Sequence, residues 1–189
     1  MTSKRYLLAV PAMLAATPAV AHTGVHVSGV LAGVLHPLTG LDHALAMVAV
    51  GLFAALLGGR ALWTVPGSFV AMMLISGALG FSGVAVPAVE IGIAASVLVL
   101  GSIVALGRAW PAGAAVALVS GFAVFHGYAH GAEIPAGAGA QWYSLGFALA
   151  SVALHLAGMA AGFVTLGPWK PARMAGAAVA IAGLVLALG

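Results

Sequence analysis

Charged side chains are scarce in this chain: lysine, arginine, aspartate and glutamate together make up only 5% of the residues. A water-soluble domain carries roughly 25% of such residues. Hydrophobic residues account for 63% of the chain, and the mean hydropathy is +1.20. The shortage of charge therefore excludes a soluble domain and predicts an integral membrane protein.

Cysteine is absent, which excludes disulfides, thiolate metal sites and thiol catalysis. Six basic residues stand against three acidic ones, and so small an excess gives no reason to expect a nucleic-acid partner. The sequence also lacks a nucleotide-binding motif. We therefore expect neither nucleic acid nor nucleotide to bind, and no prosthetic group.

Six apolar segments are each long enough to cross a hydrocarbon core of roughly 30 Å as a helix. Their polarity does not alternate between neighbouring residues, which argues against a membrane β-barrel. The predicted fold is all-α, a six-helix transmembrane bundle in a single domain over residues 22–189. The predicted helices cover residues 29–57, 62–81, 86–106, 111–128, 142–166 and 174–188.

Proline and glycine predict where the bundle departs from straight, separated helices. The first helix should break near Pro37–Gly40, because proline lacks a backbone donor and clashes with the preceding turn. Small residues inside other segments predict close approach of neighbouring helices. The clearest examples are Gly51, Gly58, Gly77 and Gly80.

Residues 1–21 have the features of a cleavable signal peptide. Two basic residues precede a short apolar run, and small residues at Ala19 and Ala21 suit cleavage after the latter. Cleavage would make His22 the new N-terminus, where its ring and a free amine could chelate a metal. The alternative is an uncleaved membrane helix kinked by its two prolines.

The basic residues predict the orientation of the bundle. Arg60, Arg108, Lys170 and Arg173 all lie in alternate connections between the predicted helices. The positive-inside rule places these connections in the cytoplasm and the mature N-terminus outside, and a signal peptide predicts the same orientation. The expected location is the bacterial inner membrane, with the lipid bilayer as partner and the oligomeric state left open.

Histidines and carboxylates gather in two short stretches beside or within apolar runs, and six of them are candidate metal ligands. They are His36, Asp42, His43, His126, His130 and Glu133. Burial of such groups in a membrane is costly and therefore indicates function. Imidazole and carboxylate together are typical ligands of divalent transition metals.

The spacing of these residues limits which of them can bind the same ion. His126, His130 and Glu133 share one helical face if the helix extends that far. Asp42 and His43 point about 100° apart on a straight helix. Either one of the two orients the other as a supporting group, or the break re-aims both.

Other residues are weaker candidates. Glu90 is a further candidate ligand, and His155 lies deeper, on a possible path inward. Met47 is a candidate thioether ligand, with packing as its favoured role. Met72, Met73 and Met159 are interpreted as packing, and Met72 and Met73 have no histidine or acid at helical spacing on their own segment.

The stretch HPLTGLDHALAM at residues 36–47 resembles the signature of the HupE/UreJ family of nickel/cobalt permeases. FHGYAHGAE at residues 125–133 is similar to that family's second motif, and the likeness covers essentially the whole chain. The resemblance implies six membrane helices after signal cleavage. It also implies passage of Ni²⁺ or Co²⁺ to supply hydrogenase or urease maturation, with Zn²⁺ left open as a substrate.

We expect outer groups such as His22 and Glu133 to capture the ion before the clustered ligands bind it, and acid to weaken uptake. Transport rather than enzyme activity is expected. One alternative is a membrane metal-binding scaffold or sensor that never transports. A more remote one is a rhomboid-like protease, with Ser82 of a G-x-S-G sequence as nucleophile and His155 as base.

Overall fold

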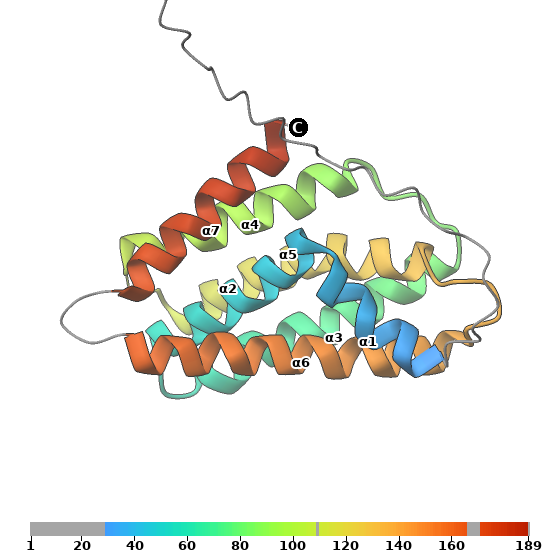
Figure 1. Ribbon diagram of the computed structural model, residues 1–189, viewed down its shortest axis with the longest axis horizontal. Coiled ribbons are helices and arrows are strands. Elements are labelled where there is room, and N and C mark those ends of the chain that lie inside the picture. Colours follow the sequence, from blue (N-terminus) through green and yellow to red (C-terminus); the bar gives the residue numbers. More distant parts are fainter. Residues whose placement is uncertain (1–28, 109, 166–170, 189) are drawn as a thin grey trace, which may run out of the picture.

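The computed structural model describes residues 29–108, 110–165 and 171–188 of the chain, and all regular structure in these ranges is α-helical. The all-α prediction is confirmed. Figure 1 shows the seven helices. They are α1 (Gly29–Thr39), α2 (Leu41–Leu57), α3 (Ala61–Phe81), α4 (Val89–Leu106), α5 (Ala112–Ala132), α6 (Ala140–Thr165) and α7 (Pro171–Leu188).

Five helices, α3 to α7, are long and apolar enough to cross a membrane, and α1 with α2 makes a sixth candidate span that is bent by 82°. The protein is thus a multi-pass membrane protein. Large apolar side chains such as Trp63 and Ile91 are more than two-thirds exposed on its outer surface, as contact with lipid requires. The predicted signal peptide and His22 lie outside the described residues and remain predictions, as does the position of Lys170.

The predicted break in the first span is confirmed and has a local cause. Pro37 stands in the last turn of α1 and has no amide hydrogen to donate. Gly40 follows in an extended conformation, with φ −85° and ψ 105°. The backbone of Gly40 still donates to the His36 carbonyl at 3.2 Å, while its own carbonyl accepts from Ala44 at 3.0 Å. One helix therefore ends and another begins at a single residue.

Glycines bring the helices close together. A Cβ atom added to Gly127 of α5 would overlap the Met73 carbonyl of α3, and one added to Gly80 of α3 would overlap the Tyr128 carbonyl of α5. Helices α4 and α7 form a second close pair, and α6 packs along α1 and α2. Van der Waals contact of this kind stabilises helix association in lipid.

Close approach is confirmed at three of the four glycines named from the sequence, Gly51, Gly77 and Gly80, because each contacts the backbone of a facing helix. It is wrong at Gly58. That residue ends α2 with φ +68°, and no atom of the described chain lies within 4 Å of the place its Cβ would take. Gly58 serves a helix end and not a helix contact.

The described basic residues lie at one end of the bundle. Figure 1 shows the α2–α3 and α4–α5 connections, and the start of α7, at the same end, opposite the α3–α4 and α5–α6 connections. Arg60, Arg108 and Arg173 belong to the first group. Arg173 also donates to the last carbonyls of α4, at Ala105 (2.8 Å) and Leu106 (2.9 Å). The assignment of this end to the cytoplasm stays a prediction.

Candidate metal centre

Four imidazole rings from three helices form one continuous cluster. His130 of α5 is at its centre, with ring centroids 4.7 Å from His36 of α1 and 4.3 Å from His43 of α2. His126, one turn before His130 on α5, lies 4.9 Å from His43. We call these four residues the histidine cluster. The bend between α1 and α2 brings both predicted stretches to one place.

Helix α5 continues for one turn beyond the predicted end, to Ala132, so His126, His130 and Glu133 follow one helical face as the spacing required. Glu133 Oε2 lies 3.1 Å from His36 Nε2. One ligand atom each from His36, His130 and Glu133 lie within 4.8 Å of one another. An ion that holds each ligand at about 2.1 Å keeps them within about 4.2 Å, so small side-chain movements suffice for joint binding.

Burial increases across the cluster. The Glu133 side chain is 54% exposed and that of His36 is 30% exposed. His130 and His126 are buried, at 3% and 0%. The cluster therefore offers ligands that run from an accessible carboxylate to fully enclosed imidazoles.

Asp42 supports His43. Its Oδ1 atom accepts from the backbone amide of His43 and lies 2.8 Å from Nδ1 of the same ring. With Nδ1 donating to the carboxylate, the lone pair of the ring is on Nε2, which is buried and has no hydrogen-bond partner among the described residues. Of the two arrangements left open by the sequence, this geometry favours Asp42 as the orienting group and His43 as the ligand.

Gly40 makes room for that pair. A Cβ atom at Gly40 would stand 3.2 Å from Asp42 Oδ1 and 3.3 Å from His43 Nδ1. The residue that ends α1 is thus also the one that leaves space for the carboxylate to reach the ring.

Ser96 of α4 orients His126 and was missed in the sequence. The Ser96 hydroxyl lies 2.6 Å from the Ile93 carbonyl, which takes its proton, and 2.8 Å from His126 Nε2. The oxygen must then accept from Nε2, so the His126 lone pair is on Nδ1. Its only sequence signal is a hydroxyl inside an apolar run.

Buried polar atoms without a hydrogen-bond partner are concentrated here. In the described part of the chain there are seven such side-chain atoms. They belong to His43, His126, His130, Tyr143 and His155. Each costs about 1–3 kcal/mol when left unpaired, and a bound metal ion would pair those ring nitrogens that carry a lone pair. Tyr143, whose ring centroid lies 5.9 Å from that of His36, was also missed in the sequence.

The weaker candidates lie apart from this arrangement. Glu90 is exposed in the first turn of α4 and forms no hydrogen bond or ion pair with another described residue. Met47 is fully buried in the apolar core, in agreement with a packing role. His155 is buried in α6, and the ring of Phe69 lies between it and the cluster, with centroids 5.3 Å from His155 and 5.5 Å from His126.

The protease alternative has no counterpart in the geometry. Ser82 is exposed at the C-terminal end of α3, and its hydroxyl donates to the Leu79 carbonyl at 2.8 Å. His155 is enclosed within the bundle, and neither of its nitrogens bonds to a described residue. The described residues therefore do not join these two side chains as nucleophile and base.

Comparison with known proteins covers the same residues. A family model described as "HupE / UreJ protein" matches residues 10–186. Protein HupE of Rhizobium leguminosarum bv. viciae is 46% identical over 171 residues, which are 89% of this chain and 90% of that protein. No solved structure matches the chain. The family match includes every candidate ligand.

Proposed function

This chain belongs to the HupE/UreJ family, and from that premise and the geometry of its site we propose that it is a permease for Ni²⁺ or Co²⁺. The ion moves from the periplasm to the cytoplasm, where it supplies hydrogenase or urease maturation. The observation that carries the proposal is the histidine cluster, in which α1, α2 and α5 contribute four imidazoles beside the carboxylates of Glu133 and Asp42. Transport, and not catalysis, is the proposed activity.

The ligand types support a transition metal as substrate. Neutral imidazoles favour borderline ions such as Ni²⁺, Co²⁺ and Zn²⁺, whereas Mg²⁺ and Ca²⁺ prefer oxygen ligands. The carboxylates offset part of the positive charge on a dehydrated dication. A site of this composition would discriminate against Mg²⁺ and Ca²⁺ through the type of ligand atom and not through the size of the ion.

The gradient of burial supports a direction of entry. Glu133 is accessible and meets the hydrated ion first, with Glu90 and His22 as further candidates for capture. His36 and His130 then replace water, and His43 and His126 offer free lone pairs further inside. The inside-negative potential, worth about 2.3 kcal/mol per charge per 100 mV, favours inward movement of a dication.

Uptake of radiolabelled Ni²⁺ and Co²⁺ into proteoliposomes tests the proposal. The wild-type protein should take up the ion, the His43→Ala variant should be at least about tenfold slower because an oriented ligand is lost, and the exposed Ser82→Ala variant should match the wild type. Wild-type liposomes that bind the ion but accumulate no more than empty liposomes would favour the scaffold or sensor.

Acid should slow uptake, because a protonated imidazole has no lone pair for a metal. A change from about pH 7.5 to about pH 4.5, equal on both sides of the membrane, is wide enough to protonate a buried imidazole as well as an exposed one. The initial rate should fall by roughly tenfold. Uptake that did not change over this range would contradict histidine ligation.

A further inference from the structure

A column of buried side chains runs between α3 and α6, away from the histidine cluster. The α6 members recur every fourth residue and therefore share one helical face. We call the column the α3–α6 seam. It consists of Phe69 and Met73 from α3 and Phe147, Ser151, His155 and Met159 from α6, all buried.

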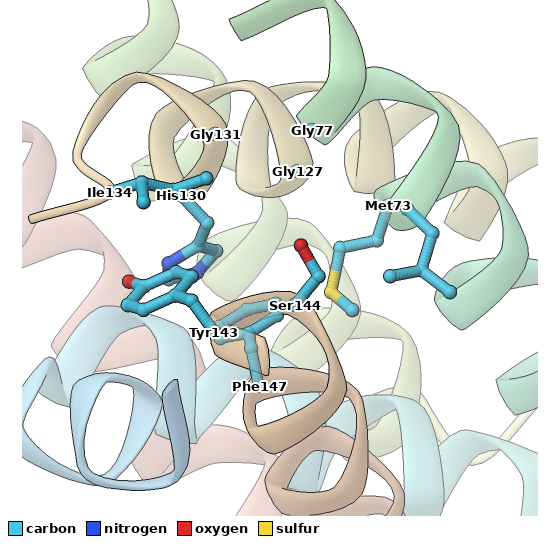
Figure 2. Close-up of a pocket in the computed structure, with 10 residues that line it drawn as sticks. Met73, Gly77, Gly127, His130, Gly131, Ile134, Tyr143, Ser144 and Phe147 are labelled. Atoms are coloured by element: carbon cyan, nitrogen blue, oxygen red, sulfur yellow. The ribbon is translucent and has the colours of Figure 1, made fainter. Parts of the chain in front are cut away.

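A small cavity joins the cluster to the seam. Its lining includes His130, Met73 and Phe147, and its volume of about 20 Å³ exceeds the roughly 10–15 Å³ that one water needs. Figure 2 shows the His130 ring and the Met73 sulfur both directed toward α6, on either side of Ser144. The central imidazole of the cluster and the first sulfur of the seam thus face the same space.

Inside the seam, a thioether from α3 and an unpaired imidazole from α6 lie about one helical turn apart along the column. The Ser151 hydroxyl lies 3.7 Å from Met73 Sδ and 2.8 Å from the Phe147 carbonyl. His155 is one turn further along α6 and contacts Phe69, which is one turn from Met73 on α3. Both ring nitrogens of His155 lack a partner in the described chain.

A second cavity begins where the seam ends. It measures about 420 Å³, is lined by His155 and Met159 together with residues from the first half of α3 such as Pro66, and opens to the outer surface at Trp63, which is 73% exposed. That half of α3 starts at Arg60, at the base-bearing end of the bundle. Met73 therefore lines the cavity beside the cluster, and His155 lines the pocket on the side of the base-bearing end.

We propose that Met73 and His155 form a second binding site for the transported ion. This inner site lies between the histidine cluster and the base-bearing end. The inference rests on the proposed function. Imidazole nitrogen and thioether sulfur both bind borderline transition metals. No carboxylate lies in the seam, so this site holds a dication more weakly than the cluster does, as release in the forward direction requires.

Packing alone does not account for the pair. A leucine or phenylalanine at position 155 would fill the same space without leaving two buried nitrogens unpaired, which costs about 1–3 kcal/mol for each group. The sequence-based interpretation of Met73 as packing considered only its own helix, whereas its neighbour Ser151 is on α6, one turn from His155.

Transport kinetics of matched variants test the inner site. Met73→Leu keeps the size of the side chain and removes the sulfur, and Met72→Leu is the control one position earlier on the same helix, where the side chain is only partly buried. Met73→Leu should lower kcat for Ni²⁺ by roughly threefold or more with KM nearly unchanged, whereas Met72→Leu should leave both unchanged. His155→Phe should lower kcat by roughly tenfold, and His155→Met, which restores a ligand, should recover part of it.

Equal rates for Met73→Leu and Met72→Leu, or wild-type turnover by His155→Phe, would overturn the inner site. If His155→Phe does not fold, the methionine pair decides. Binding gives a second readout: a Co²⁺ titration of the solubilised wild type should show a tight phase and a weaker one, and Met73→Leu should lose only the weaker. A wild type that transports but has no weaker phase contradicts the inner site alone. A wild type that shows both phases but moves no ion contradicts the proposed function instead.

Discussion

The histidine cluster and the α4–α7 pair differ in whether their buried polar groups are hydrogen-bonded. On α4, Ser102 donates to the Leu98 carbonyl at 2.7 Å, and Arg173 of α7 donates to the last carbonyls of α4. The two helices meet at Gly101 and Gly176, where a Cβ would press on the facing backbone. Within the described residues, none of the seven buried unpaired atoms belongs to either helix.

Around the cluster, several buried polar atoms stay unpaired, and those that are paired serve to orient a ring. Asp42 and Ser96 each occupy one nitrogen of a histidine and leave the other with its lone pair free. The two regions therefore have different roles. The α4–α7 pair contributes stability through contact, whereas the cluster forgoes hydrogen bonds in order to bind an ion.

Among the variants that test this comparison, His130→Leu at the centre of the cluster should have the largest effect. Metal affinity and uptake should fall by about a hundredfold or more, beyond the 10–100-fold that loss of a supporting group costs. The metal-free protein should be as stable as the wild type or more so, because an unpaired buried imidazole is replaced by an apolar group. Calorimetric metal titration and thermal unfolding without metal measure the two quantities. A variant that binds metal normally would break the comparison.

Gly176→Val should have the opposite profile. Its side chain would meet the backbone of Ala105 on α4, and overpacking of this kind costs about 1–3 kcal/mol. The unfolding temperature should drop, while the fraction that stays folded binds metal with wild-type affinity. Gly121→Val is the matched control, since no atom of the described residues lies within 4 Å of a Cβ at Gly121. Weakened metal binding in the folded fraction would show that the two regions are coupled.

Asp42→Asn addresses how the cluster is prepared for the ion. Asparagine can still accept the hydrogen bond from His43 Nδ1, but the negative charge is lost. Affinity for Ni²⁺ should fall by roughly 10–100-fold, as is usual for a group that orients a ligand, with little change in stability. The dissociation constant and the KM for uptake are the measurements. An unchanged dissociation constant would mean that Asp42 only stabilises the start of α2.

The parts of the site that depend on local chain properties could be predicted from the sequence. Proline and glycine act on their own backbone, so the break at Pro37–Gly40 was readable. The two histidine stretches could be predicted as candidate ligand sites because histidines are unusual in so apolar a chain. The end of α5 is predicted one turn too early, at residue 128 instead of Ala132. In the structure Gly131 continues the helix and packs on Gly77 of α3.

The parts that depend on contacts between helices could not be predicted. Nothing near Ser96 in the sequence marks it as functional, because its contact with His126 depends on how α4 packs. Met73 has no histidine or acid at helical spacing on α3, and the hydroxyl that contacts its sulfur, that of Ser151, comes from α6. The relation between Asp42 and His43 stayed open because a straight helix separates them by about 100°, whereas a carboxylate in the first turn can fold back on the next residue.

The smallest effect is expected from Ser96, which links α4 to the cluster through its hydrogen bond with His126. Ser96→Ala removes the acceptor for His126 Nε2, so the ring can rotate or change tautomer while its neighbours remain. A neutral hydrogen bond contributes about 0.5–1.5 kcal/mol, and uptake should slow by roughly threefold. Ser102→Ala is the matched control, because that hydroxyl donates to the Leu98 carbonyl of its own helix and has no other partner among the described residues. If the two variants slow uptake equally, α4 supports the bundle but does not orient the ligand, and the boundary between the two regions lies between Ser96 and His126.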